Sequence, residues 1–149
     1  MTKSSKLFLF PDINVWVALT YERHVHHSVA RKWFDGLETS ARLFFCRFTQ
    51  LGLLRLLCAE AVMGPDQAKS QKEAWSAYDA WLDDDRVDML DEPAELETNF
   101  RALTRSPQPA TKDWADSYLV AFALAARLTI VTFDSAMRAK ANAPLLLKP

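Results

Sequence analysis

The chain has 149 residues, of which 50% are hydrophobic and 25% charged, and its formal net charge is -1. This length predicts a single domain over residues 1–149 with a core of its own, and five Trp, nine Phe and three Gly exclude a mainly disordered chain. The near-neutral charge also argues against binding of nucleic acid by bulk electrostatics. Any contact with phosphates therefore requires a local patch or a bound metal ion.

The first apolar run covers residues 7–10 and ends at Pro11. A run of this kind predicts a short buried strand. It is too short for a secretory signal, which needs roughly 7–15 apolar residues, or for a membrane span of about 20. We therefore expect a cytoplasmic protein without membrane contact.

The rest of the chain alternates helical patterns with short apolar runs. Helical spacing predicts helices over residues 15–19, 26–37, 49–59, 66–82, 93–105 and 111–126, with a short helix from 135. Apolar runs predict further strands over residues 43–46, 87–90, 128–133 and 145–147. Thr49 and Asp66 are the expected N-caps of their helices. This alternation predicts one α/β domain with a mostly parallel sheet covered on both faces.

Carboxylates lie where the predicted strands end. Asp12 follows the first strand and Asp134 follows the strand over 128–133. Asp116 lies in the first turns of the most apolar helix, with Asp113 three residues earlier on the same face. Working groups of α/β sheets gather at the carboxyl ends of the strands. If these acids converge, their repulsion requires a cation, and hard oxygen ligands suit Mg²⁺ or Mn²⁺.

Each acid also has a structural interpretation. Asp12 and Asp134 can cap the helices that follow them, and Asp113 can stabilise its helix through the macrodipole. Asp116 is harder to explain in this way, because it lies past the cap in a nearly all-apolar helix, where an acid is rarely unpaired. Spacing alone leaves both interpretations open.

Four short motifs occur in a fixed order. They are LFPDINVWVAL at 9–19, TQLGLLR at 49–55, WADSYLVAFA at 114–123 and VTFD at 131–134. Together they resemble the PIN domain and, more narrowly, the VapC-type toxins of bacterial toxin–antitoxin pairs. The resemblance covers nearly the whole chain.

The resemblance implies a three-layer fold with a small parallel central sheet flanked by helices. It implies a Mg²⁺-dependent endoribonuclease that hydrolyses RNA phosphodiester bonds, forms a homodimer and is blocked by a cognate VapB-type antitoxin. By motif, Asp12, Asp116 and Asp134 match the catalytic acids that hold the metal. Asp12 and Asp116 are expected to bind it directly, whereas Asp134 acts through water or a second ion. Asn14 and Thr132 match supporting polar positions.

One acid of the family pattern is missing. The family usually has a Glu early in the helix that here begins near Thr49, and Gly52 occupies that position. A subset of VapC-like toxins shares the Thr-Gln-Leu-Gly form. Asp113 is expected to supply the missing charge, and Gln50 offers a weaker oxygen ligand.

Positive charge for a substrate strand is sparse and scattered. Arg55 lies one helical turn beyond the Thr-Gln-Leu-Gly stretch, so it is the candidate for contact with phosphate or antitoxin. Further cations near the predicted strand ends are Arg42, Arg47, Arg138 and Lys140. For each of these, an ordinary solvated surface charge is the competing interpretation.

Two other functions compete with the nuclease. A haloacid-dehalogenase-like phosphatase also begins with a strand and an Asp, but it needs a second Asp as proton donor where this chain has Asn14. The other alternative is a degenerate PIN fold that binds RNA or protein without cutting. The missing Glu favours that alternative, and the three retained acids oppose it.

Overall fold

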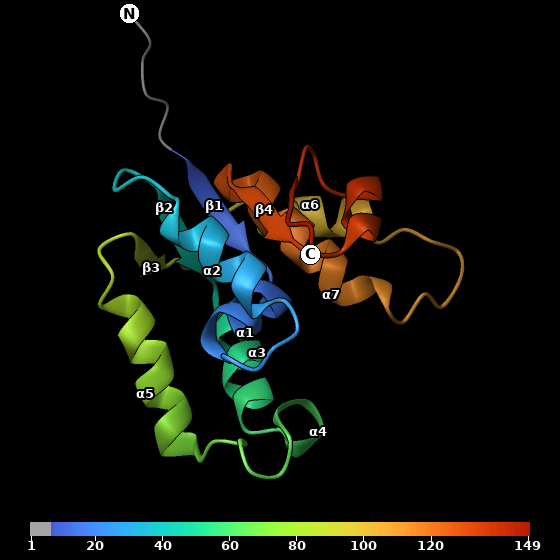
Figure 1. Ribbon diagram of the computed structural model, residues 1–149. Coiled ribbons are helices and arrows are strands. Elements are labelled where there is room, and N and C mark those ends of the chain that lie inside the picture. Colours follow the sequence, from blue (N-terminus) through green and yellow to red (C-terminus); the bar gives the residue numbers. More distant parts are fainter. Residues whose placement is uncertain (1–6) are drawn as a thin grey trace, which may run out of the picture.

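Five parallel strands form one sheet in the order β3-β2-β1-β4-β5 in the computed structural model, which describes residues 7–149 (Figure 1). The strands are β1 Phe8–Pro11, β2 Arg42–Phe45, β3 Val87–Met89, β4 Thr129–Thr132 and β5 Leu145–Leu146. Each overlaps a predicted strand, so the predicted parallel sheet is confirmed. Residues 1–6, part of the predicted domain, lie outside the described residues.

Helices connect the strands. They are α1 Ile13–Thr20, α2 His27–Asp35, α3 Arg47–Leu57, α4 Glu60–Met63, α5 Gln71–Leu82, α6 Leu96–Leu103, α7 Asp113–Ala126 and a 3₁₀ helix, η1 Ser135–Ala139. The short helix α4 was not predicted, and α6 begins three residues later than the sequence indicates. Within residues 7–149 no helix combines the length and the apolar character that crossing a membrane requires.

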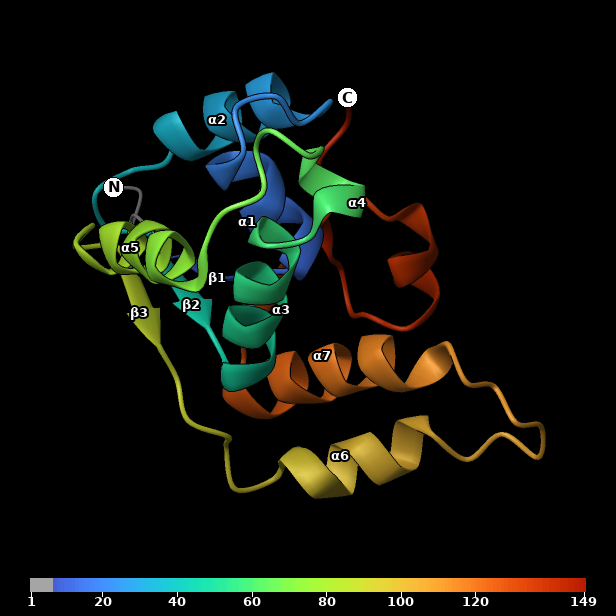
Figure 2. The ribbon, with the colours of Figure 1, turned by 90° about the horizontal axis from the view of Figure 1, so that it is seen from below.

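Two apolar cores cover the two faces of the sheet. Leu9 packs in one core with residues of α1, α2, α3 and α5, whereas its neighbour Phe10 packs in the other with residues of α6 and α7. Successive side chains of a strand point to opposite faces, so one strand contributes to both cores. Figure 2 shows α6 and α7 side by side, apart from α1, α2 and α5. The predicted three-layer arrangement is confirmed.

The predicted helix caps Thr49 and Asp66 are wrong. Helix α3 begins earlier, with Cys46 as N-cap, and the Thr49 hydroxyl accepts the Cys46 N–H at 2.9 Å from the third helical position. Helix α5 begins after Ser70, not Asp66. There the Ser70 hydroxyl accepts the Glu73 N–H at 3.1 Å and Glu73 accepts the Ser70 N–H at 2.9 Å. This reciprocal pair satisfies two free donors at the helix start, which a lone Asp66 does not.

The strand order places a crevice beside β1. Strand β1 pairs with β2 on one side and with β4 on the other, and the connections on the two sides cross opposite faces of the sheet. Ligands of open α/β sheets bind outside the carboxyl ends of the strands at such a switch point. The pairing of Pro11 with Val131 brings Asp12 next to Thr132 at this point.

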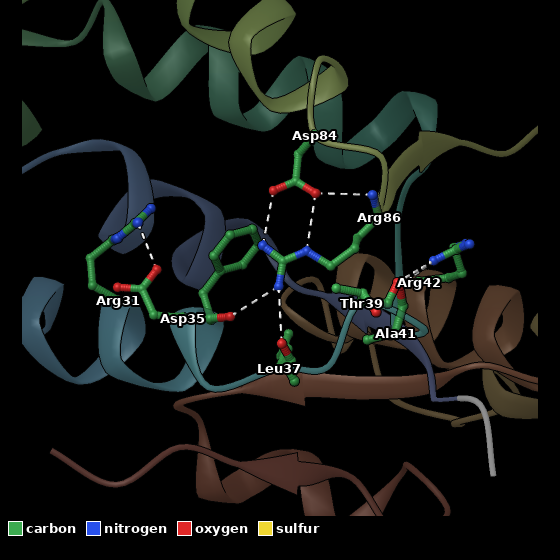
Figure 3. Close-up of polar contacts among 9 residues, drawn as sticks. Arg31, Asp35, Leu37, Thr39, Ala41, Arg42, Asp84 and Arg86 are labelled. Atoms are coloured by element: carbon green, nitrogen blue, oxygen red, sulfur yellow. Dashed lines mark hydrogen bonds and ion pairs between the residues drawn. The ribbon is translucent and has the colours of Figure 1, made fainter. Parts of the chain in front are cut away.

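Arg86 joins the start of β3 to the loop after α2, away from the crevice (Figure 3). Its guanidinium donates two hydrogen bonds to the Asp84 carboxylate, at 2.9 and 3.0 Å, and lies 4.3 Å from the centre of the Phe34 ring. It also donates to the carbonyl oxygens of Phe34 and Leu37, both at 3.3 Å. The ion pair lowers the pKa of Asp84. The Arg86 side chain thus holds the end of α2 and the loop after it against the start of β3.

Candidate active site

Asp12 is a buried carboxylate at the end of β1, with an exposed fraction of 8%. One oxygen accepts the Val15 N–H at 3.1 Å and so caps α1, and the other accepts the Thr132 hydroxyl. Burial raises its pKa above the ordinary 3.8; these hydrogen bonds oppose the shift, and the charge of Asp116 adds to it. Asp12 therefore caps the helix, as the structural interpretation predicts, and also faces another acid.

Thr132 connects two of the predicted acids. Its hydroxyl is fully buried, donates to Asp12 and accepts the Asp134 N–H at 3.0 Å. A hydroxyl has one proton and two acceptor lone pairs, so both bonds are satisfied at once. The end of β4 is thereby tied to the carboxylate at the end of β1.

Asp116 completes the group from α7. It lies in the first turn of this helix and is half-buried, and its pKa is raised first by burial and then by the negative charge of Asp134. Asp134 itself is exposed, and it caps η1 by accepting the Ala136 N–H at 2.9 Å. The fold thus brings three acids from three separate segments close enough to influence one another.

Asp12 and Asp116 line the same cavity, which has a volume of about 280 Å³. Its remaining wall residues are Ile13, Asn14, Phe48, Arg55, Leu56, Ala115 and Leu119. Most of these side chains are apolar, and an apolar wall strengthens any charge interaction inside the cavity. The Asn14 amide and the Arg55 guanidinium belong to the other polar residues among those that line the cavity.

The acids fit a hard divalent cation. Among residues 7–149 no three His, Cys, Asp or Glu side chains are grouped closely enough to form a ready-made metal site. Two partly desolvated carboxylates with raised pKa values nevertheless share one cavity. One or two carboxylates, with water filling the other positions, are the usual protein ligands of such an ion. The donor set therefore suits a partly hydrated ion.

Two predicted site residues have other partners. The Asp113 carboxylate accepts hydrogen bonds from the Lys140 ammonium and from the Ser117 hydroxyl, at 3.2 Å for the latter. The Gln50 amide oxygen accepts the Arg47 guanidinium at 2.6 Å. Neither side chain lines the cavity, and their expected roles in place of the missing Glu stay predictions.

The space at the missing acid is filled by Ile13, a residue that the motif analysis did not select. A Cβ atom at Gly52 would lie 2.4 Å from Cδ1 of Ile13 and 2.8 Å from its Cγ1. Such distances are far below van der Waals contact, so position 52 carries no side chain while Ile13 keeps this place. A glycine inside a helical pattern often has a packing reason, so Gly52 is the signal that could have led to this contact.

Comparisons with known proteins identify the family. A family model described as PIN domain matches residues 9–143. Ribonuclease VapC41 of Mycobacterium tuberculosis is 44% identical over 131 residues, which cover 86% of this chain and 90% of that protein.

Solved structures share the fold. VapBC2 of Rickettsia felis, solved bound to a DNA fragment from its promoter, superposes with a TM-score of 0.66 at 14% identity, covering 94% of this chain and 96% of that one. VapC20 of M. tuberculosis, a Sarcin-Ricin loop cleaving toxin, gives 0.62 at 16% identity, with coverage of 88% and 93%.

Proposed function

The chain belongs to the PIN domain family, and from this premise we propose that it is a ribonuclease, the toxin of a toxin–antitoxin pair. Its reaction is the metal-dependent hydrolysis of phosphodiester bonds inside RNA. The observation that supports it best is the shared cavity of Asp12 and Asp116, at the switch point of the sheet and beside Asp134. The missing Glu favours the non-catalytic alternative, but the comparisons oppose it, because the 44% identical relative is a ribonuclease.

Asp12 and Asp116 would hold the metal, for which we propose Mg²⁺, with Mn²⁺ as a substitute. When bound, the ion polarises the phosphodiester and activates water for attack. Thr132 and the Val15 N–H fix the orientation of the Asp12 carboxylate, so its position does not depend on the substrate. The exposed Asp134 carboxylate, whose charge raises the pKa of Asp116, would hold a water molecule next to that residue.

Arg55 supplies positive charge on the wall of the same cavity. An unbound site with several carboxylates repels a polyanion, and a guanidinium offsets part of this repulsion and binds phosphate oxygens by a fork of donors. We therefore assign Arg55 to phosphate binding. Asn14 offers an uncharged amide at the cavity edge, where it supports the acids without adding negative charge.

The partners follow from the same family. We propose RNA as substrate, because the 44% identical relative is a ribonuclease, and a VapB-type antitoxin as inhibitor, because a structural neighbour is a VapBC complex. A homodimer and a cytoplasmic location complete the proposal. The homodimer is checked by measuring the molar mass in solution with light scattering at several concentrations.

Cleavage by purified, antitoxin-free protein tests the function. Total RNA is incubated in Mg²⁺, Mn²⁺ or EDTA with the wild type, with Asp116→Asn and with Asp66→Asn, an exposed carboxylate in another part of the chain. We expect discrete fragments that require metal, a loss of at least roughly 100-fold in Asp116→Asn, and no loss in the Asp66 control. A folded wild type that cuts no RNA on any metal would contradict the proposal and favour a binding module.

A further inference from the structure

A second hollow lies on another side of the first turn of α7. It has a volume of about 570 Å³ between α6 and α7 and is lined by Glu97, Phe100, Arg101, Thr104, Arg105 and Trp114. Successive helical residues are 100° apart, so Ala115 and Asp116 face the acid cavity while Trp114 faces α6. Figure 2 shows the two helices running side by side around this region. The same helical turn thus borders both hollows.

Trp114 is an exposed aromatic ring held in place from one side. Its exposed fraction is 53%, and the Phe100 ring meets it edge to face with the centres 5.9 Å apart. This contact fixes the indole orientation but leaves much of its surface uncovered. Large exposed aromatic rings are uncommon and indicate a partner when other features support one.

Two guanidinium groups provide that support. Arg105 forms no ion pair within residues 7–149, and Arg101 pairs only with Glu97 at 3.0 Å, where both side chains are about three-quarters exposed. Such an exposed pair is weak and is readily exchanged for a phosphate. The hollow therefore combines a π-face with two available cations. Single-stranded nucleic acid is bound by this combination, with bases stacked on aromatic rings and a basic groove along the backbone.

We propose that Trp114, Arg101 and Arg105 form a subsite for single-stranded RNA, in which a base of the substrate strand beyond the scissile phosphate stacks on Trp114. The inference rests on the proposed function, because Asp116 marks the position of the scissile phosphate. The strand passes over the start of α7 from one hollow to the other. The two arginines bind the phosphates that flank the stacked base.

Binding to a fluorescein-labelled, unstructured RNA of 12 nucleotides tests the subsite. All proteins carry Asp116→Asn to prevent cleavage, and anisotropy reports the dissociation constant. We expect Trp114→Ala to weaken binding about 5- to 150-fold, the range that one lost base stack gives. Trp114→Phe keeps a π-face and should restore most of the affinity. Phe8→Ala is the matched control and should leave affinity unchanged, since Phe8 is 44% exposed at the start of β1, the end of the strand away from Asp12.

The contribution of the two arginines is measured by the salt dependence of RNA affinity. Removing both Arg101 and Arg105 should reduce the slope of log affinity against log salt by roughly 1.4, since each phosphate contact to a single strand contributes roughly 0.7. Equal affinities of the Trp114→Ala and Phe8→Ala proteins would overturn the subsite. A change in molar mass in Trp114→Ala would also overturn it and assign the ring to a protein interface. A wild type that neither binds nor cuts RNA would refute the proposed function as well, whereas normal cleavage with an inert Trp114 refutes the subsite alone.

Discussion

Gly52 lies in α3 with the Ile13 side chain directly over it, so adding one methyl group there is a sharp test of the packing beside the acids. The new Cβ in Gly52→Ala would lie 2.4 Å from Cδ1 and 2.8 Å from Cγ1 of Ile13. Carbon atoms in contact are about 3.5–4.0 Å apart, so either Ile13 or one of the two helices must move.

The size of the effect comes from two opposing contributions. Overpacking of this kind costs about 1–3 kcal/mol, whereas replacing a helical Gly by Ala gains about 1 kcal/mol. Gly52→Ala should therefore lower the free energy of unfolding of the wild type by up to about 2 kcal/mol. In an Ile13→Ala background the clash is absent, and the same change should stabilise by about 1 kcal/mol. The coupling between the two sites is thus about 1–3 kcal/mol.

Urea unfolding of the four proteins in this cycle measures the coupling. The control is Gly36→Ala, because a Cβ at Gly36 meets only carbonyl oxygens at 3.4 and 3.6 Å, which is ordinary contact, and its backbone is right-handed helical. This change should stay within about 1 kcal/mol of the wild type and show no coupling to Ile13. A stabilising effect of Gly52→Ala in the wild type, additive with Ile13→Ala, would refute the reasoning.

Three further predictions concern other parts of the chain. Without metal, in EDTA, ionisation of Asp116 opposes folding because the pKa of this carboxyl is raised in the folded state. The protonated carboxyl contributes stability below pH 3.8, and this contribution is lost as the pH rises through the raised pKa. Asp116→Asn should therefore gain stability over the wild type in thermal unfolding at pH 7 and not at pH 3, and an equal difference at both would contradict the argument. Thr132→Val is similar in volume but cannot orient Asp12, so it should reduce the rate of RNA cleavage about 10- to 100-fold. Thr132→Ser keeps the hydroxyl and should cleave at nearly the wild-type rate. Equal cleavage rates of the two variants would show that the hydroxyl has no role in the site. Arg86→Lys should lower the free energy of unfolding by about 1–3 kcal/mol, because an ammonium cannot serve the carboxylate and both carbonyls. The exposed Arg31→Lys is its control and should cost under about 1 kcal/mol, so equal costs in urea unfolding would rule out the special role of Arg86.

Most elements of the fold could be predicted because their signals are local. Apolar runs and helical spacing located every strand and most helices, and they identified the sheet as parallel. The correct cap of α5 is also visible in the sequence, since Ser70 and Glu73 have the capping-box spacing that the structure uses in place of Asp66. The order of the strands could not be read in this way, because it depends on pairing between segments far apart in the chain.

In the candidate site, too, local signals could be read from the sequence and long-range pairing could not. Asp12 and Asp134 were found because the ends of parallel strands meet at one edge of the sheet, and Asp116 because an acid in an apolar helix needs a partner. Asp113 lies on the same face of α7 as Asp116, yet its partner is Lys140, which is 27 residues away. No local sequence pattern predicts a pairing over that separation. Sequence position identifies which acids can converge, and long-range pairing decides which of them are neutralised.

The Ile13 side chain explains how the cavity can work with fewer acids than the family pattern has. For both Asp12 and Asp116, burial is the larger cause of the raised pKa and repulsion between acids the smaller one. A carboxylate at position 52 would increase the repulsion, whereas an apolar side chain beside Asp12 increases the desolvation. Both routes make the remaining carboxylates more basic, and a divalent cation relieves both by replacing the missing solvation and opposing the charge. Cation binding should therefore lower the pKa values of this pair even without a further acid.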